Sequence, residues 1–518
     1  MIHVTADTAH IIIPWREDLS NLVPHGRRMA WNNQDLLVIP NEHAEAKVCR
    51  NVGVAVPAPI LTRYDWMGQT PWDIQRTTAA LLTESERAYV LSTMGTGKTR
   101  AALFAADYLM RAGACQKVLI TAPLSTLTPV WETELFRVMP QRRVKVLHGD
   151  KAKRLKLLSE DADFYVINHH GLHLLQKELI AKKFDIVIVD ELAVFRNRST
   201  RLWKAINGIV SSAGVQFAWG MTGAPTPTSP VDAWAQLRLL TPSRTSRTIG
   251  QFQDQTMRKI SDFKWIARPD ANDIVFKAMQ PSVRFTRDDV MELPPTTYVT
   301  RDVKLSAEAA KAYKLLFDKM RHITQSGQSI TAANEGVLQN KLLQVACGFI
   351  YTDDRKIYEL DNKPRLDALD EVVDECDRKL IVCVPYIHAL QGIAEHLRKN
   401  KHSVSVVYGA TSRTQRDAIF KAFRERDDPR ILVMHPACAA HGLTLVEANT
   451  ICWYAPTNSL ETYDQLNARI TRPGQTSKTL IVHLAGTTVE KHVYTRLRER
   501  AKMQGLLLQL FKDQTLEY

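Results

Sequence analysis

The segment Ser92-Thr93-Met94-Gly95-Thr96-Gly97-Lys98-Thr99 decides the fold of this chain. The apolar run Ala88–Leu91 before it predicts a buried strand, and residues 100–110 after it predict a helix. A glycine-containing loop between a strand and a helix is typical of phosphate binding. Glycine lets successive backbone N–H groups point at one place, and the helix adds the positive end of its dipole there.

This loop predicts a nucleotide site with assigned roles. Lys98 would reach the β- and γ-phosphates, and the Thr99 hydroxyl would bind Mg²⁺. The strict pattern has glycine at position 92, where this chain has serine. The alternative is a glycine-containing turn before an ordinary helix, and the Gly-Lys-Thr sequence at such a junction argues against it. The nucleotide-binding residues predicted from the loop are Met94, Gly95, Thr96, Gly97, Lys98 and Thr99.

An acidic pair follows a second apolar run, Asp185–Val189, which predicts another buried strand. Downstream of a phosphate loop, Asp190 would hold Mg²⁺ and Glu191 would polarise the attacking water. Two acids at a strand end could instead cap a helix. The presence of Lys98 favours the catalytic interpretation and predicts ATP and Mg²⁺ as cofactors.

Residues upstream of the loop predict adenine recognition. Trp72 could stack on the base, and the amide of Gln75 could donate to and accept from its edge. Any helix start can carry a tryptophan and a glutamine, so this pattern alone is weak.

The composition restricts the partners. The chain has 518 residues, 45% hydrophobic and 24% charged, with a net charge of +13 and a pI of about 9.3. Such an excess of basic residues favours a polyanionic partner. Seven scattered cysteines without a Cys-x-x-Cys pair argue against a zinc site and fit a reducing cytosol. Because no apolar stretch approaches ~18 residues, we expect no transmembrane helix and a cytoplasmic protein.

Small polar residues follow several predicted strands, where parallel sheets bind ligands. Serine, threonine and asparagine at these positions can hold nucleic-acid phosphates, although each segment could also be an ordinary turn. Lys151, Lys153, Arg154 and Lys156 predict a basic helix face, which is usually solvated and could also contact DNA. The DNA-binding residues predicted in this way are Ser125, Thr126, His148, Asn168, Gly409 and Thr444.

Two further motifs predict communication with the γ-phosphate. Thr222 and Gly223 form a turn that could sense it. Arg469 and Arg472 are three residues apart, so on a helix they would share a face and could stabilise charge in the transition state. Without Lys98 and Glu191 they would be two exposed arginines on a surface helix.

Alternation of strands and helices predicts an α/β chain of two lobes with parallel sheets. Its expected parts are residues 1–62, an α+β accessory domain; 63–240, the nucleotide-binding lobe; 241–360, a helical insertion with long helices over 305–322 and 338–345; and 361–518, the second lobe. Strands are expected at Ile11–Ile13, Leu36–Ile39 and Val52–Val56, and Pro57–Pro59 suggests a linker. Arg27, Arg28 and Trp31 could contact nucleic acid or form a solvated turn beside a core tryptophan.

The order of these motifs resembles the Swi/Snf-like branch of helicase superfamily 2, over about Trp66 to Arg496. The resemblance is carried by Gln75, the Gly95–Thr99 loop, Pro123–Ser125 with Trp131, His148-Gly149, Asp190-Glu191 with Arg196-Asn197, Thr222–Pro225, Leu293–Pro295, Gly442–Leu445, and Gln465, Arg469 and Arg472 with Gly474-Gln475. Among the departures, Ala193 replaces a usual histidine, which would leave the acidic pair without its link to Thr222.

The resemblance implies two RecA-like lobes that hydrolyse ATP in the cleft between them and step along duplex or branched DNA. It also implies a nucleotide contact for Gly442, a coupling role for Gln465, a monomer, and a compact bacterial or bacteriophage protein. Two alternatives remain: a helicase that separates DNA or RNA strands, and a non-catalytic nucleic-acid-binding scaffold. Intact Lys98, Asp190 and Glu191 argue against the scaffold. We also expect residues 1–65 to bind DNA or guide substrate choice.

Overall fold

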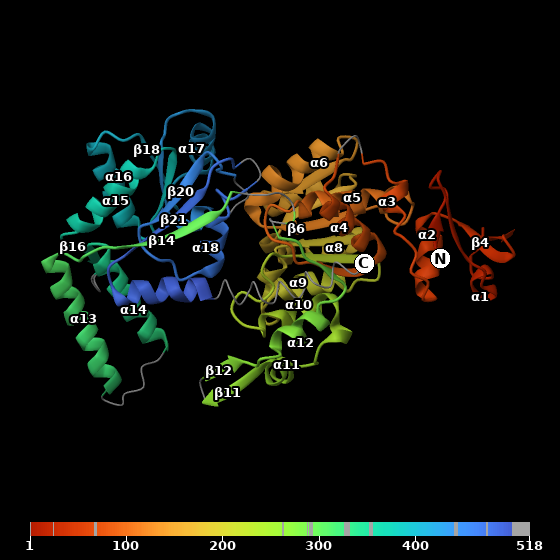
Figure 1. Cartoon of the computed structure of the whole chain (residues 1–518), viewed down its shortest axis with the longest axis horizontal. Coiled ribbons are helices and arrows are strands. Elements are labelled where there is room, and N and C mark those ends of the chain that lie inside the picture. Colours follow the sequence, from red (N-terminus) through yellow and green to blue (C-terminus); the bar gives the residue numbers. More distant parts are fainter. Residues whose placement is uncertain are drawn as a thin grey trace. The chain divides into compact units, whose positions relative to one another are not determined.

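The computed structural model separates into two compact units, residues 1–290 and residues 291–503 (Figure 1). The structure describes residues 2–23, 25–66, 70–261, 264–286, 289, 294–325, 332–351, 356–439, 444–472 and 475–499. Each unit is built around one parallel sheet, as the sequence predicts. Figure 1 shows helices flanking both sheets.

The N-terminal region forms an antiparallel sheet with the strand order β1-β2-β4-β3. Its helices α1 (Glu17–Ser20) and α2 (His43–Asn51) contribute Leu19, Ala46 and Cys49 to one apolar cluster with β2 and β4. The predictions at 11–13 and 36–39 are confirmed. The strand expected at 52–56 is wrong, because Gly53 turns with φ +81° just after α2 and residues 54–58 are irregular. The strands are β1 (His3–Val4), β2 (His10–Pro14), β3 (Arg27–Trp31) and β4 (Gln34–Pro40).

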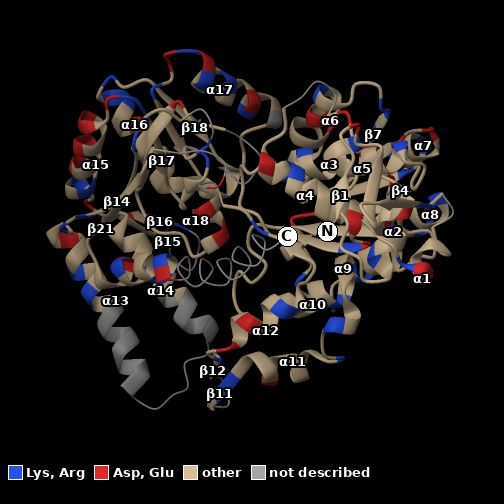
Figure 2. Ribbon diagram, turned by 45° about the vertical axis from the view of Figure 1, so that its right-hand side comes forward, with Lys and Arg blue, Asp and Glu red and all other residues tan. Residues whose placement is uncertain are grey.

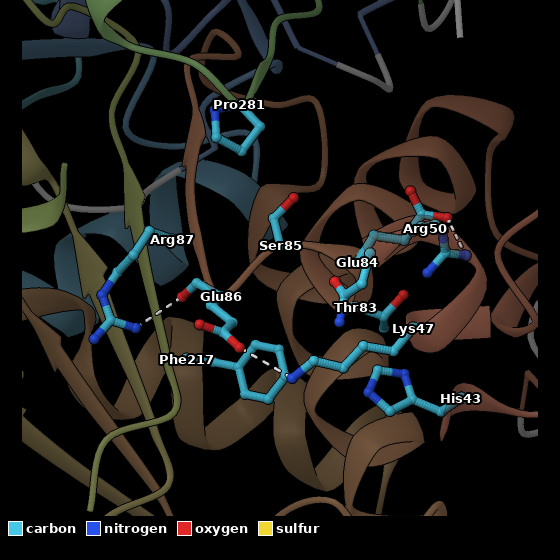
Figure 3. A pocket seen from close by; sticks show the side chains of 11 residues that line it. His43, Lys47, Arg50, Thr83, Glu84, Ser85, Glu86, Arg87, Phe217 and Pro281 are labelled. Carbon is cyan, nitrogen blue, oxygen red and sulfur yellow. Dashed lines mark hydrogen bonds and ion pairs between the residues drawn. The ribbon is translucent and has the colours of Figure 1, made fainter. Parts of the chain in front are cut away.

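The join to the first lobe is packed. Val56 belongs to the N-terminal cluster and Ala58 to the cluster of α4 and α5, so the chain passes from one core to the other at Pro57–Pro59, where we expected a linker, and this segment is packed against the lobe. Lys47 and Arg50 of α2 form ion pairs with Glu86 (3.0 Å) and Glu84 (2.7 Å) of the lobe. Figure 3 shows these pairs around a pocket of about 360 Å³.

The first lobe is a seven-stranded parallel sheet in the order β13-β5-β10-β9-β6-β8-β7. Alternate residues of β9 face two separate cores. Ile186 and Ile188 pack with α4, α5 and α6, whereas Val187 and Val189 pack with α8, α9 and α10. The strands are β5 (Arg87–Val90), β6 (Val118–Ala122), β7 (Val144–Leu147), β8 (Phe164–Asn168), β9 (Ile186–Asp190), β10 (Phe217–Met221) and β13 (Ser282–Val283). The helices are α3 (Ile60–Arg63), α4 (Asp73–Glu84), α5 (Lys98–Arg111), α6 (Thr133–Val138), α7 (Lys151–Ser159), α8 (Gln176–Lys182), α9 (Arg201–Val210) and α10 (Asp232–Leu240).

Residues 241–290 contain strands that we did not predict. Between α11 (Ile249–Thr256) and α12 (Ala271–Ala278) lies the hairpin of β11 (Met257–Ser261) and β12 (Lys264–Ala267). After α12 the chain adds β13 beside β5. Backbone N–H groups of Tyr89, Leu91 and Thr93 donate to Pro281, Val283 and Phe285 at 3.0, 2.8 and 2.9 Å. The strand that leads into the phosphate loop is therefore held by a segment from much later in the chain.

The second unit is a six-stranded parallel sheet in the order β14-β21-β20-β17-β19-β18. The strands predicted at 380–384, 404–408, 431–434 and 450–454 are confirmed, as are both long helices. The strands are β14 (Thr296–Asp302), β17 (Lys379–Cys383), β18 (Val404–Val407), β19 (Ile431–Met434), β20 (Ala448–Trp453) and β21 (Thr479–Ala485), and the pair β15 (Phe349–Tyr351) and β16 (Ile357–Glu359) stands apart. The helices are α13 (Ala307–Gln325), α14 (Ala332–Ala346), α15 (Lys363–Glu375), α16 (Ile387–Lys399), α17 (Arg413–Glu425), α18 (Leu460–Asn467) and residues 488–499.

A buried ion pair holds the second unit together. Arg365 of α15 and Glu490 lie 2.6 Å apart and are 2% and 0% exposed in their side chains. The guanidinium also donates to the carbonyls of Ala346, Tyr454 and Leu484, so one side chain links α14, α15, β21 and the residue that follows β20.

All seven cysteines are buried free thiols. Within the described ranges, no helix is long and apolar enough to cross a membrane. The same residues contain no cluster of histidine, cysteine and acidic side chains suited to a metal ion.

Candidate active site

The phosphate loop joins β5 to α5. Gly95 and Gly97 have φ values of +89° and +74°, which side chains other than glycine rarely adopt. The Lys98 ammonium donates to the carbonyls of Ser92 (2.7 Å) and Thr93 (2.9 Å) at the start of the loop. The Lys98 ammonium therefore lies against the backbone of its own loop, at the N-terminus of α5.

The serine that departs from the usual glycine has a structural role. Ser92 is 1% exposed, and its hydroxyl accepts the backbone N–H of Phe285 at 2.9 Å. This bond extends the pairing of β13 with β5 into the loop. The Ser92 side chain thus ties the edge of the loop to Phe285, a bond that glycine could not make.

Gln75 packs against the loop glycine. It is 3% exposed, and its Oε1 accepts the backbone N–H of Trp72 at 2.9 Å. A Cβ atom on Gly97 would lie only 2.0 Å from Gln75 Nε2. Glycine at 97 is therefore required by space as well as by backbone conformation. The ring of Trp72 is 38% exposed, so it is open to stacking.

Asp190 ends β9 and has both carboxylate oxygens engaged. The indole N–H of Trp131 donates to Oδ2 at 3.0 Å, and the Glu191 backbone N–H donates to Oδ1 at 3.1 Å. Burial raises the pKa of the Asp190 carboxyl, whereas the bond from Trp131 and the charge of Lys98 lower it. The sequence analysis missed this contact, because it joins residues 59 positions apart.

Glu191 is held by the turn after β10. Its backbone has φ +54°, and its Oε1 accepts the hydroxyl of Thr222 at 2.8 Å. Thr222 is 1% exposed, and its backbone N–H donates to Val90 of β5 at 3.0 Å. A Cβ on Gly223 would be 3.6 Å from the Ser92 carbonyl. The acidic pair is thus linked to the turn directly, although Ala193 lacks a polar side chain.

These residues fit a nucleoside triphosphate with Mg²⁺. Backbone N–H groups at a helix N-terminus and an ammonium suit phosphates, and the oxygens of Thr99 and Asp190 are the ligand type that Mg²⁺ prefers. When bound, Mg²⁺ neutralises charge on the transferred phosphoryl group. Glu191, oriented by Thr222, is placed to position water or take its proton.

The residues predicted to bind DNA in the first lobe do not share one environment. The Arg154 side chain is 7% exposed and donates to the Gly149 carbonyl and to Asn168 Oδ1, both at 2.8 Å. Arg154 therefore does not belong to an exposed basic face, and the Asn168 side chain, 6% exposed, would have to leave this bond to touch a phosphate. His148 is exposed.

The turn after β6 carries the other two candidates of this lobe. Ser125 lies in the short helix Leu124–Thr126, and the Thr126 hydroxyl donates to the Pro123 carbonyl at 2.9 Å. Lys151, Lys153 and Lys156 are exposed on α7. Figure 2 shows basic and acidic residues interspersed on the helices of the described part of the chain.

The arginine motif of the second unit is not helical. The helix α18 ends at Asn467, so our expectation that Arg469 and Arg472 share a helix face is wrong. Arg469 is fully buried, and its carbonyl accepts the Leu445 N–H at 3.0 Å. Arg472 donates from Nη1 to the Thr444 hydroxyl at 3.1 Å, so Thr444 is engaged within its own unit.

Three further residues predicted in the second unit are Gln465, Gly409 and Gly442. Gln465 is on α18, where its amide donates to Glu461 at 3.0 Å, and Gly409 is exposed after β18. Gly442 lies outside the described residues. Gln475 Nε2 lies within 3.1 Å of three backbone carbonyls, those of Val446, Ala448 and Ile470, which gives the trailing glutamine a structural role.

Comparisons with known proteins identify the family. Residues 78–347 match the SNF2-related domain, and residues 364–474 match the helicase conserved C-terminal domain. The protein p41 of Acyrthosiphon pisum secondary endosymbiont phage 1 is 26% identical over 86% of this chain and 99% of its own length. An uncharacterized ATP-dependent helicase of Mycoplasma genitalium is 25% identical over 77% of this chain, which spans 38% of that protein. The solved Sulfolobus solfataricus SWI2/SNF2 ATPase core in complex with dsDNA aligns at 20% identity with a TM-score of 0.42, covering 87% of this chain and 95% of that one.

The chain belongs to the SNF2-related family of helicase-like proteins, because the matching domain covers more than half of it. It is a compact member of helicase superfamily 2 and a DNA-dependent ATPase. The resemblance drawn from its motifs is confirmed.

Proposed function

We propose that this protein is an ATP-driven motor that translocates along duplex or branched DNA. The observation that supports this most is the complete hydrolysis set of the first lobe: Lys98 over the loop, Asp190 beside Trp131, and Glu191 bonded to Thr222. A binding scaffold would not need a glutamate whose carboxylate is oriented by a buried threonine.

We propose Thr99 and Asp190 as Mg²⁺ ligands, and Trp72, Gln75 and the loop 94–99 as the ATP site. Following the resemblance, Arg469 and Arg472 would act on the γ-phosphate, with Gly442 and Gln465 supporting them. Ser125, Thr126, His148, Asn168, Gly409 and Thr444 remain DNA-contact proposals. The domain limits 1–62, 63–240, 241–360 and 361–518 are kept as proposed functional parts. We place the protein in a bacterial or phage-infected cell as a monomer.

The test is ATP hydrolysis by the full chain without nucleic acid and with single-stranded DNA, duplex DNA, forked DNA or RNA. Strong stimulation by duplex or forked DNA supports the motor. Stimulation by single strands or RNA alone favours a strand-separating helicase, and no hydrolysis under any condition contradicts both. Lys98→Ala should abolish turnover. Glu191→Gln should abolish it while still binding ATP, and normal hydrolysis by Glu191→Gln would refute the role given to this residue.

A second experiment addresses the basic helix α7. Substituting alanine for both Lys151 and Lys156 should weaken duplex binding and lower its dependence on salt, because phosphate contacts release counterions. The control is Lys399→Ala on α16, a lysine with 73% of its side chain exposed. Equal effects of the two changes would count against α7 as a DNA contact.

A further inference from the structure

The N-terminal sheet has one face that no helix of its own region covers. The buried side chains Ile11, Ile13, Leu37 and Ile39 face α1 and α2. The strand register places the alternate residues on the opposite face, because directly paired residues share a face. Two rows of paired residues run across the strands on that face. One row consists of His3, Ile12, Val38 and Arg27, and the other of Pro14, Leu36 and Met29.

This open face combines apolar, aromatic and basic groups. Its members are exposed or half-exposed, and none of them is acidic: His3, His10, Ile12, Pro14, Arg27, Met29, Trp31, Gln34, Leu36, Val38 and Pro40. Trp31 is 63% exposed at the end of β3. The turn Asn32-Asn33 has φ values of +47° and +60°, the geometry of a tight hairpin, and it keeps Trp31 paired with Gln34.

A hollow of about 730 Å³ lies along the same face and includes His10, Arg27, Met29 and Val38. Two acidic residues, Glu42 and Glu45, line it as well. Glu45 is 7% exposed and lies 3.3 Å from His25, so its charge is largely turned inward. Arg28 also lines the hollow but is paired with Asp35 and lies over the ring of Trp15.

We propose that this open face binds single-stranded nucleic acid, with a base stacked on Trp31 and the backbone near Arg27. The inference deepens the proposed function, since it names the form of nucleic acid that the N-terminal region takes. The side chains of Met29, Leu36 and Val38 provide apolar surface for contact with the bases. Only unpaired bases can use such a surface, because the bases of a duplex are already stacked. The strand side chains of the open face include Arg27 and no carboxylate, so these strands suit an anionic partner better than a basic one.

The first test measures binding of a fluorescein-labelled 15-residue oligo-dT to the full chain by anisotropy, without ATP. Trp31→Ala should weaken binding about ten-fold or more, the effect of losing one stacked base. Arg27→Ala should weaken binding and reduce its salt dependence. The matched control is Phe136→Ala, which removes another exposed aromatic (74%) from α6 of the same unit. Thermal melting verifies that each variant folds, and a parallel titration with oligo-rU tells RNA from DNA.

The second test locates the contact independently of affinity. Photocrosslinking with 5-iodouracil oligonucleotides should label the tryptic peptide of residues 29–47, which holds Trp31 and Val38. Oligonucleotide binding that is equal for wild type, Trp31→Ala and Phe136→Ala would overturn the proposal and leave the face to a protein partner. Crosslinks only elsewhere in the chain would overturn it too.

A third measurement separates this inference from the motor. ATP hydrolysis on plain duplex should be unchanged by Trp31→Ala, whereas its stimulation by a fork with a single-stranded arm should fall. If the wild type binds the oligonucleotide through Trp31 but no DNA stimulates hydrolysis, the motor proposal fails and the single-strand site stands. If DNA stimulates hydrolysis and Trp31→Ala responds to forks like the wild type, the single-strand site is refuted.

Discussion

Replacing Gly97 with alanine tests whether Gln75 and the phosphate loop form one unit. The new Cβ would lie 2.0 Å from Gln75 Nε2, at a backbone φ of +74°. The left-handed conformation costs a non-glycine residue about 1 kcal/mol. Displacing the buried Gln75 amide from its bond to the Trp72 N–H costs about 1–3 kcal/mol more. Binding of ATP must restore the wild-type conformation of the loop at the cost of both free energies. We therefore expect the affinity of the protein for ATP to fall about 100-fold.

The assay is displacement of a fluorescent ATP analogue by ATP and by tripolyphosphate, which lacks the base that Gln75 is predicted to contact. The matched control is Gly113→Ala. Gly113 follows the same helix with φ +72°, but a Cβ there meets nothing within 4 Å. That change should lower the melting temperature by a few degrees and leave both affinities within about two-fold, since about 1 kcal/mol of strain falls outside the loop.

The double change Gln75→Ala with Gly97→Ala removes the obstruction. Tripolyphosphate affinity should recover most of its loss, whereas ATP affinity should not, because the adenine contact is gone. A Gly97→Ala chain that binds ATP within about three-fold of wild type would show that Gln75 does not constrain the loop, and the reasoning would be refuted.

Three further changes address hydrolysis and stability. Thr222→Val removes the hydrogen bond to Glu191 and should lower kcat about ten- to hundred-fold with little change in ATP affinity, measured by steady-state hydrolysis with mant-ATP binding as control. Arg365→Met leaves Glu490 buried and unpaired and should cost the second unit about 3–5 kcal/mol in urea unfolding, and adding Glu490→Leu should recover much of it; a loss below ~1 kcal/mol would contradict the buried-pair argument. Burial lowers the pKa of His483 to about 4, so the folded state binds fewer protons than the unfolded state between pH 6.5 and 4. The contribution of His483 to stability is therefore nearly complete at pH 7.5 and has fallen by about 2 kcal/mol at pH 5. Hydrogen exchange of β21 should accordingly show a shallower pH slope in His483→Phe than in the wild type.

Much of the fold follows from short apolar runs, and the exceptions have physical causes. The runs at 88–91 and 185–189 predict central strands because strands covered on both faces carry apolar residues throughout. The pattern at 52–56 suggested a strand, but Gly53 turns the chain at the end of a helix. Ser282–Val283 is too short to stand out, and its strand exists only because the edge of β5 is open to it.

The candidate site was predictable for residues whose chemistry follows from a short local motif. Lys98 and Asp190 were identified from their motifs, and the structure places Lys98 at the N-terminus of α5 and Asp190 at the end of β9. Trp131 was missed because the bond from its indole depends on a contact across 59 positions, which no local pattern encodes. Arg469 was placed on a helix face because it is three residues from Arg472, whereas α18 ends at Asn467 and the Arg469 carbonyl accepts the Leu445 N–H.

The dependence of the phosphate loop on β13 has a consequence for how the protein is made. Ser92 and Phe285 are 193 positions apart, so at ~5–20 residues per second the ribosome needs roughly 10–40 s to deliver the partner of the loop strand. Until then the nascent chain presents β5 with unpaired N–H and C=O groups, which invite pairing with another chain. The ATP site is complete only once residue 285 has left the exit tunnel, and only then can bound nucleotide stabilise it. Interruptions of synthesis before that point should therefore yield aggregation-prone fragments, and interruptions shortly after it a folded first unit.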